Sequence, residues 1–170
     1  MKYALIGSIV LFCLSLFAAK SGLVVFNWTG SEPRGLYWLK HGHTSDRDLV
    51  LVCLTKGQEF PAIVAGLDPG RGSCPSGFQP ILKHLYVASL QHPVEFDQFG
   101  FKVDGQRLHN TQPLLHGRFG VTFPRLASGR YTGGLFVISD YNARSYDSRY
   151  FGAVSQDQII SFAVPVLVIP

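Results

Sequence analysis

The sequence predicts a mainly β protein in which one N-terminal transmembrane helix is followed by an antiparallel β domain. An uncharged apolar run opens the chain, and 18 glycines and 10 prolines supply many turns. Beyond the run, the apolar segments are short and lack an extended helical period. A length of 170 residues suits one anchor and one domain. We therefore place the membrane anchor at residues 1–26 and the β domain at 27–170.

The apolar run extends from Tyr3 to Ala19 without a charged residue. As a helix it would span about 25 Å, slightly less than the ~30 Å hydrocarbon core of a bilayer. Lys20 could snorkel to the interface, and the following apolar residues could lengthen the span. The alternative is a cleaved signal peptide. Leu16 and Phe17 occupy positions where cleavage sites prefer small residues, which favours a retained anchor.

The first part of the β domain should contain one buried strand and then turns. Asp48–Thr55 is β-branched and apolar, as expected of a buried strand. Gln58–Leu67 could form one short helix, broken near Gly66. Asp68–Gly77 is dense in turn-forming residues.

The second part should add three strands and a hairpin. Gln79–Leu90 alternates as a strand does, although it carries a lysine at position 83. Asp104-Gly105 predicts a tight hairpin turn within Phe96–Asn110. Gly133–Asp140 should be a buried strand, and Gln158–Pro170 the last strand.

The composition excludes some classes of partner. The formal charge of +4 comes without a Lys/Arg run, so we expect no nucleic-acid binding, whereas attraction to anionic membrane lipid is reasonable. The six histidines lack metal-ligand spacing with cysteines or acidic residues. We therefore expect neither a metal nor a cofactor.

Two short stretches contain residues that could carry chemistry. Thr29-Gly30-Ser31, stiffened by Pro33, would present a serine hydroxyl together with free backbone N–H groups. The alternative is an ordinary polar turn at the end of the membrane helix. Lys83 in an apolar strand would have a lowered pKa and could act as a base. The alternative is a lysine on the solvent face of an edge strand.

A third stretch, Ser139–Gly152, concentrates hydroxyls, aromatics and charges directly after a predicted buried strand. In an extended segment Asp147 and Arg149 point the same way, so they could pair. The alternative is a polar loop. The density of polar groups favours a role in a site.

Together these stretches resemble a known family. "NWTGSEPRGLY" (27–37), "PILKHLYV" (80–87) and "ARSYDSRYFG" (143–152), in this order, resemble the type I signal peptidase superfamily. The nearest branch is the TraF-type conjugative-transfer peptidases, which also share the run from Cys74 to Lys83. The resemblance covers Asn27 to about Val154, nearly the whole predicted domain.

The resemblance implies a signal-peptidase-like antiparallel β domain with a Ser/Lys dyad. Ser31 would be the nucleophile and Lys83 the general base. The oxyanion hole would comprise the Ser31 N–H and the Thr29 hydroxyl. Ser145 would orient the lysine. Asp147 and Arg149 would be structural support rather than chemistry.

The chain departs from the family pattern at two positions. Glu32 follows the serine, where the family usually has methionine, and this puts substrate specificity in doubt. His84 follows the lysine, where the family usually has arginine, and this could remove a charge pair with an acidic residue near Asp140. Neither departure removes a member of the dyad.

The cysteines and charges bear on the compartment. Cys53 and Cys74 could form a disulfide, which would imply an oxidising compartment, or could remain two unlinked thiols. Lysines and arginines after the apolar run would instead favour a cytoplasmic domain. The resemblance implies the periplasmic face of a bacterial inner membrane, with a single-pass anchor in contact with inner-membrane lipid.

Three functions remain open. The first is a serine endopeptidase that matures a secreted, pilin-like precursor for conjugative transfer, with hydrolysis or cyclisation completing the reaction. The second is a general leader peptidase acting on many preproteins. The third is a non-catalytic scaffold of a secretion or mating channel.

Overall fold

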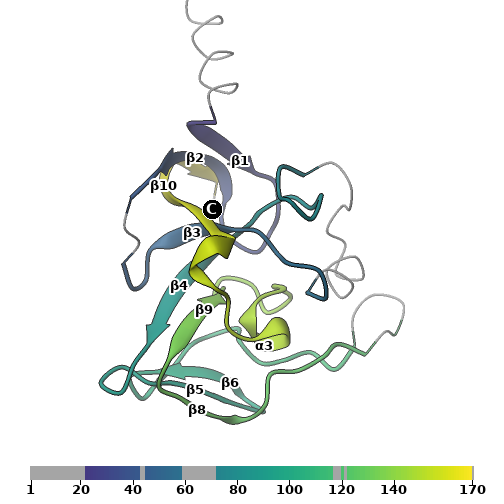
Figure 1. Cartoon of the computed structure of the whole chain (residues 1–170). Helices are drawn as coiled ribbons and strands as arrows, with labels where there is room; N and C mark the ends of the chain where they lie inside the picture. Colours follow the sequence, from purple (N-terminus) through teal and green to yellow (C-terminus); the bar gives the residue numbers. More distant parts are fainter. Residues whose placement is uncertain (1–21, 43–44, 59–71, 117–119, 121, 170) are drawn as a thin grey trace, which may run out of the picture.

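The protein folds into two antiparallel β-sheets (Figure 1). The computed structural model describes residues 22–42, 45–58, 72–116, 120 and 122–169. The large sheet has six strands in the order β1-β2-β10-β3-β4-β9. Their bounds are β1 Val24–Asn27, β2 Arg34–Lys40, β3 Leu49–Val52, β4 Ile81–Ala88, β9 Gly134–Ile138 and β10 Ile159–Ile169.

The small sheet has the order β7-β6-β5-β8 and lies at the opposite end of the molecule from β1 (Figure 1). Its strands are β5 Val94–Asp97, β6 Gly100–Val103, β7 Gln106–Arg107 and β8 Gly129–Tyr131. One helical turn, α3 (Ser148–Phe151), lies beside β9, and a 3₁₀ turn, η2 (Gln156–Gln158), precedes β10.

The predicted mainly β architecture is confirmed. The strands expected around positions 50, 85, 136 and 164 correspond to β3, β4, β9 and β10. The hairpin turn at Asp104-Gly105 is also present, with φ of 51° and 76° at its two central residues. These positive values are those a type I′ turn requires.

Other elements were not anticipated. Strand β1 directly follows the apolar run at the N-terminus, β2 begins and ends with a charged residue, and β8 has only three residues, so none of them has the pattern of a separate buried strand. The tail of the polar stretch 139–152 forms α3, which Asp147 caps by accepting a hydrogen bond from the Arg149 N–H. Local capping thus ordered a segment for which a polar loop was the alternative.

The boundary expected for the anchor needs a correction. Val24–Phe26 pair with β2, as in the register Val24↔Trp38, so these residues belong to the sheet and not to a span ending at residue 26. The apolar run 3–19 and most of the helix expected at 58–67 lie outside the described residues. Within the described ranges, no helix is long and apolar enough to cross a membrane.

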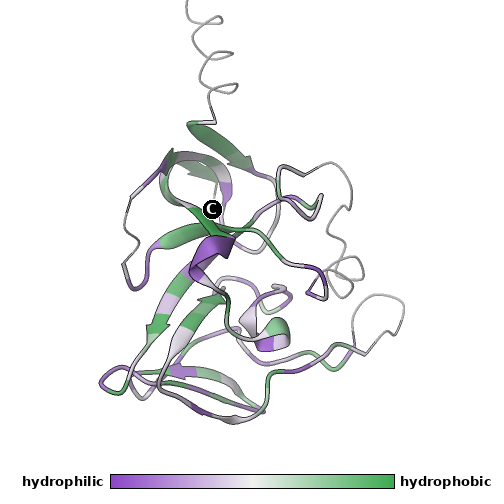
Figure 2. Cartoon of the chain, viewed as in Figure 1, coloured by the Kyte–Doolittle hydropathy of each residue, from purple (hydrophilic) through white to green (hydrophobic). Residues whose placement is uncertain are grey.

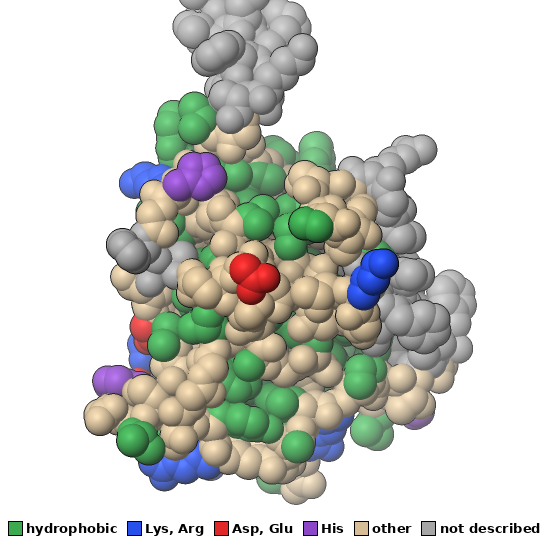
Figure 3. All heavy atoms as spheres, in the orientation of Figure 1, with side chains coloured by type: hydrophobic (Ala, Val, Ile, Leu, Met, Phe, Trp, Pro, Cys, Tyr) green, Lys and Arg blue, Asp and Glu red, His purple; other side chains and the backbone are tan. Residues whose placement is uncertain are grey.

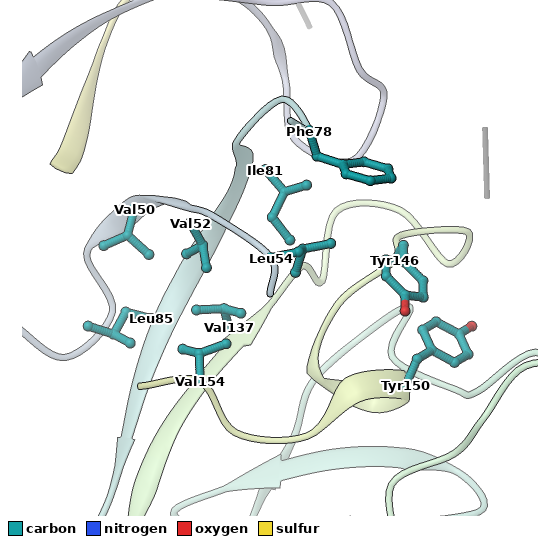
Figure 4. Close-up of a cluster of buried hydrophobic side chains, with 10 residues drawn as sticks. All are labelled: Val50, Val52, Leu54, Phe78, Ile81, Leu85, Val137, Tyr146, Tyr150 and Val154. Carbon is teal, nitrogen blue, oxygen red and sulfur yellow. The ribbon is translucent and has the colours of Figure 1, made fainter. Parts of the chain in front are cut away.

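The core has three clusters of buried side chains, of which the largest packs between the large sheet and α3 (Figure 4). A second cluster joins β4 and β9 to the small sheet, and a third lies among β2, β3, β4 and β10. Burying each such apolar side chain contributes roughly 1.5–3 kcal/mol. Because β4 supplies residues to all three clusters, Lys83 on this strand is held in the interior.

Strand β10 brings the N-terminal strands to the centre of the fold. It pairs with β2 along one edge and with β3 along the other, with a bulge between Pro165 and Leu167. At Gly35 any Cβ atom would collide with the backbone of Leu167, so glycine permits this close approach. The connection between β1 and β2 is thereby placed near β4.

Candidate active site

Lys83 is buried in the middle of the protein, on strand β4. Lys83 is 2% exposed, because β4 lies between β3 and β9 and contributes to the core on both faces. The β4–β9 ladder ends with the pair His84↔Ile138. The stretch of β4 at Lys83 is therefore open on the β9 side, and the solvent-face alternative for this lysine is wrong.

The segment between β1 and β2 brings Ser31 to this open stretch. Lys83 Nζ donates hydrogen bonds to Ser31 Oγ at 2.7 Å and to the carbonyl oxygen of Leu82 at 2.8 Å. Ser31 itself is half-buried. Two residues 52 positions apart in the sequence are thus within hydrogen-bond distance.

Burial lowers the pKa of Lys83 to about 8. Desolvation disfavours the ammonium form, and the carboxylates of Asp147 and Glu32 partly oppose this effect. A lysine with this pKa is neutral in a usable fraction near neutral pH. The neutral amine can accept a proton from the hydroxyl that it contacts.

Asn27 holds together the serine loop, the connection 28–33 between β1 and β2. Its side-chain oxygen accepts hydrogen bonds from the Thr29 N–H at 3.1 Å and the Thr29 hydroxyl at 2.7 Å. Its amide group donates to the carbonyl oxygens of Glu32 at 3.0 Å and Pro33 at 3.1 Å. Asn27 begins the first motif, but its role was not predicted from the sequence. A buried amide is needed there because the tight loop leaves its backbone groups unpaired.

Two side chains from the segment after β9 hold the same loop from outside. Asn142 Nδ2 donates to the Gly30 carbonyl at 2.8 Å, and the Ser139 hydroxyl donates to the Ser31 carbonyl. Neither residue was singled out from the sequence. The only signal was their place in the polar stretch 139–152.

The structure places Thr29 next to the nucleophile candidate. Thr29 Oγ1 lies 3.2 Å from Ser31 Oγ. In this structure the Thr29 hydroxyl donates its hydrogen to Asn27. To stabilise an oxyanion, the hydroxyl would have to rotate away from that partner.

Ser145 differs from what the resemblance implies. It is 2% exposed, and its hydroxyl has no hydrogen-bond partner among the described residues. The Lys83 amine contacts Ser31 and the Leu82 carbonyl instead. The expected bond from Ser145 to the lysine is therefore not formed in this structure.

Asp147 and Arg149 form a fully buried pair behind the site. Arg149 donates from Nε and Nη2 to the two carboxylate oxygens, each at 2.8 Å. Its remaining N–H groups bond the carbonyls of Asn110, Ala143 and Ser139. This fork ties α3 to the segment that holds the serine loop.

Cys53 and Cys74 form a disulfide in the structure, with their Cα atoms 5.4 Å apart. The bond closes the excursion between β3 and β4 and so fixes the approach to the β4 strand that carries Lys83. Cys13 lies outside the described residues. Among the residues that are described, no cluster of three potential metal ligands occurs.

Two hollows differ in their relation to this geometry. The larger, about 590 Å³, is lined by residues 97–99 and 125–128 and contains neither Ser31 nor Lys83. The smaller, about 340 Å³, is lined by Gly30, Glu32, Arg34, Tyr141 and Ile169. The smaller hollow also lacks Ser31 and Lys83 in its lining, but it lies next to the site, because Gly30 and Glu32 flank Ser31 in the chain.

The chain resembles known proteins along most of its length. The family model "Signal peptidase, peptidase S26" matches residues 93–168, which include Ser145, Asp147 and Arg149 but neither Ser31 nor Lys83. A "Plasmid transfer protein TraF" of Escherichia coli is 32% identical over 170 residues, covering 98% of this chain and 94% of the relative.

Two further relatives agree with this. Another "Plasmid transfer protein TraF" of Escherichia coli is 31% identical over 144 residues, covering 83% of this chain and 80% of the relative. A "Conjugal transfer protein TraF" of Agrobacterium fabrum is 28% identical over 142 residues, covering 82% of this chain and 80% of the relative. These relatives, unlike the family model, extend over both halves of the candidate site.

Proposed function

This chain belongs to the TraF-type branch of the signal peptidase S26 family, and from that premise we propose that it is a serine endopeptidase. Ser31 is the nucleophile and Lys83 the general base. The observation that carries the proposal is the 2.7 Å contact between Ser31 Oγ and the buried Lys83 Nζ. A serine hydroxyl beside an amine of lowered pKa is the arrangement that a Ser/Lys mechanism needs.

Acylation begins with the neutral Lys83 amine. The amine takes the proton of the Ser31 hydroxyl while Oγ attacks the scissile carbonyl carbon. The resulting oxyanion is stabilised by the Ser31 N–H and by the Thr29 hydroxyl after its rotation. The C–N bond then breaks, the Lys83 ammonium returns the proton to the leaving amine, and an ester on Ser31 remains.

Release of the ester needs a second nucleophile. Water, deprotonated by the regenerated Lys83 amine, gives a linear product. The amino group of the substrate's own N-terminus gives a cyclic product instead. Both routes share the acylation step, and their products differ in mass by one water.

The proposed substrate is a secreted, pilin-like precursor used in conjugative transfer. The names of the relatives, which are plasmid and conjugal transfer proteins, support the role in conjugative transfer, and the pilin-like precursor is what the family resemblance implies. An enzyme dedicated to one precursor needs only a small domain, and this chain has a small domain with few insertions. A general leader peptidase would instead process unrelated precursors, and a scaffold would process none.

We place the domain on the periplasmic face of a bacterial inner membrane, next to a single-pass anchor. The support is an exposed apolar surface on β1, β2 and β10, of which β1 and β10 are mostly hydrophobic (Figure 2). Apolar side chains are visible at the β1 end in Figure 3. The surface comprises Phe26, Trp28, Trp38 and residues 166–169.

This surface suits the interface of a bilayer. Exposed apolar patches mark interaction sites, and tryptophans favour the headgroup region. Trp28 is 74% exposed and lies three residues before the nucleophile in the chain. The disulfide adds support for the periplasm, because such bonds persist in oxidising compartments.

The test is to co-express the full-length chain with a pilin-like precursor and to weigh the product by mass spectrometry. Ser31→Ala and Lys83→Met should each abolish processing. Ser45→Ala, at an exposed serine, and Lys102→Met, on strand β6, are the matched controls and should process normally. Substantial processing by Ser31→Ala would refute the proposal.

A further inference from the structure

A buried carboxyl group lies directly after the nucleophile. Glu32 is 2% exposed, although carboxylates are rarely buried without partners. Its Oε1 atom has no hydrogen-bond partner within the described ranges. Its Oε2 atom lies 3.7 Å from His84 Nε2, an ion-pair distance rather than a hydrogen bond. The mechanism described above makes no use of this group.

The contact between Glu32 and His84 lies next to the contact between Ser31 and Lys83. Ser31 contacts Lys83, and the following residues of the two segments, Glu32 and His84, also contact each other. This is possible because β9 leaves the sheet after Ile138, opposite His84. The serine loop fills the open stretch of β4, so Ser31 and Glu32 reach successive residues of the same strand.

His84 is oriented toward Glu32 by the backbone. Its Nδ1 atom lies 3.2 Å from the carbonyl oxygen of Arg47. A carbonyl only accepts hydrogen bonds, so Nδ1 is the donor and Nε2 is the atom left to face the carboxyl group. Glu32 thereby has a fixed partner on β4, beside Lys83.

Burial and several neighbouring groups change the pKa of the Glu32 carboxyl. Burial raises its pKa to about 7, while His84 and Lys83 on β4 oppose the rise. After β9, Ser139 also opposes it, and the carboxylate of Asp140 adds to it. Burial is the main cause of the raised pKa values of the Tyr37 and Tyr86 phenol groups, and the Glu32 charge adds to the rise.

In its ionised form the Glu32 carboxyl carries a negative charge that acts on Lys83. A negative charge near an amine favours its ammonium form, and Glu32 does raise the pKa of Lys83 against the larger effect of burial. The carboxylate of Asp147, behind Lys83, acts in the same direction. Unlike Asp147, which is paired with Arg149, Glu32 is on the nucleophile's own loop.

We propose that Glu32 is a positioning residue of the dyad: docked against His84, its carboxylate favours the Lys83 ammonium and sets the pH range in which Lys83 accepts the Ser31 proton. This inference rests on the proposed function. Replacing Glu32 by glutamine keeps the size of the side chain but removes the charge. The amine then becomes neutral, and hence a base, at a lower pH.

The experiment is a titration of the full-length chain in detergent micelles. Lysine residues labelled with ¹³C are followed by NMR, and Lys83 is assigned by its absence in Lys83→Met. Glu32→Gln should lower the Lys83 midpoint by about one pH unit, as expected for loss of a nearby charge. The pH at which the processing rate is half-maximal should fall by the same amount.

Two comparisons show whether the effect belongs to this contact. Adding His84→Gln to Glu32→Gln should shift the midpoint no further, because His84 acts on Lys83 through Glu32. His92→Gln removes another histidine–carboxylate contact, from His92 Nδ1 to Asp104 Oδ1 at 3.0 Å on an exposed turn. This control should leave the Lys83 midpoint unchanged.

A Lys83 midpoint that is unchanged or higher in Glu32→Gln overturns the inference. An equal loss of processing rate at every pH in this variant also overturns it. Glu32→Met, checked for folding by thermal unfolding, is the second variant if the glutamine variant does not fold. The NMR titration needs no substrate. A chain that processes no precursor but shows the predicted shift would refute the proposed function and leave the action of Glu32 on Lys83 intact.

Discussion

At the scale of single residues, the defining feature is a lysine in a site where an ammonium ion is costly. Lys83 has two hydrogen-bond acceptors, Ser31 Oγ and the Leu82 carbonyl, but almost no water. Its pKa is lowered to about 8. Below that value the ammonium form dominates and cannot take the serine proton.

The rate of precursor processing should therefore rise with pH. The neutral fraction of Lys83 grows about tenfold per pH unit and levels off above a midpoint near 8. Lys83→Arg stays charged at every accessible pH, so its rate should fall by roughly a hundred- to ten-thousandfold, the usual contribution of a general base. The measurement is a pH profile of processing, with wild type and the arginine variant side by side.

Two results would contradict this prediction. One is a rate that still climbs toward ~10.4, the value for an ordinary lysine. The other is an arginine variant that keeps most of the activity. Lys102→Met serves as the control, since Lys102 lies on β6 in the small sheet.

At the scale of elements, the short helix α3 is held in place by one buried guanidinium group. Arg149 is 0% exposed and bonds both oxygens of Asp147 together with backbone carbonyls from the segment after β9. That same segment supplies Ser139 and Asn142 to the serine loop. Helix position and loop position are thus linked through a single ion pair.

Replacing Arg149 by methionine should destabilise the fold by roughly 3–5 kcal/mol, because it leaves Asp147 buried without its partner. The exposed pair Arg47–Asp104, 3.5 Å apart, provides the control. Arg47→Met should cost under about 1 kcal/mol, since exposed ion pairs contribute little. Denaturant unfolding of the full-length chain in micelles measures both variants, and equal losses would show that α3 does not depend on the buried pair.

At the scale of the whole molecule, the disulfide between Cys53 and Cys74 bears on where the protein folds. It spans 21 positions of sequence, and closing such a loop is worth roughly 3 kcal/mol. This stabilisation is available only in an oxidising compartment. The bond therefore connects the fold to the proposed periplasmic location.

Thiol labelling of membrane-bound, full-length protein checks this. In unreduced, denatured protein only Cys13 should react, because Cys53 and Cys74 are bonded. After reduction all three cysteines should react. Labelling of all three without reduction would reject both the bond and the argument for the periplasm.

The sequence predicted those elements whose signal is local. The strands β3, β4, β9 and β10 contain apolar or alternating runs that a short window detects. The turn at Asp104-Gly105 follows from the backbone angles that this pair adopts easily. The dyad candidates Ser31 and Lys83 were found because three ordered motifs resemble one family.

The sequence by itself thus determined the mainly β architecture, the order of the motifs and the residue types of the dyad. Only the tertiary structure decided the partners of those residues. The contacts of Asn27, Ser139 and Asn142 with the serine loop, and of Glu32 with His84, join segments whose distance is set by strand register. Register depends on long-range pairing through β10 and on where β9 ends, and no local pattern encodes either.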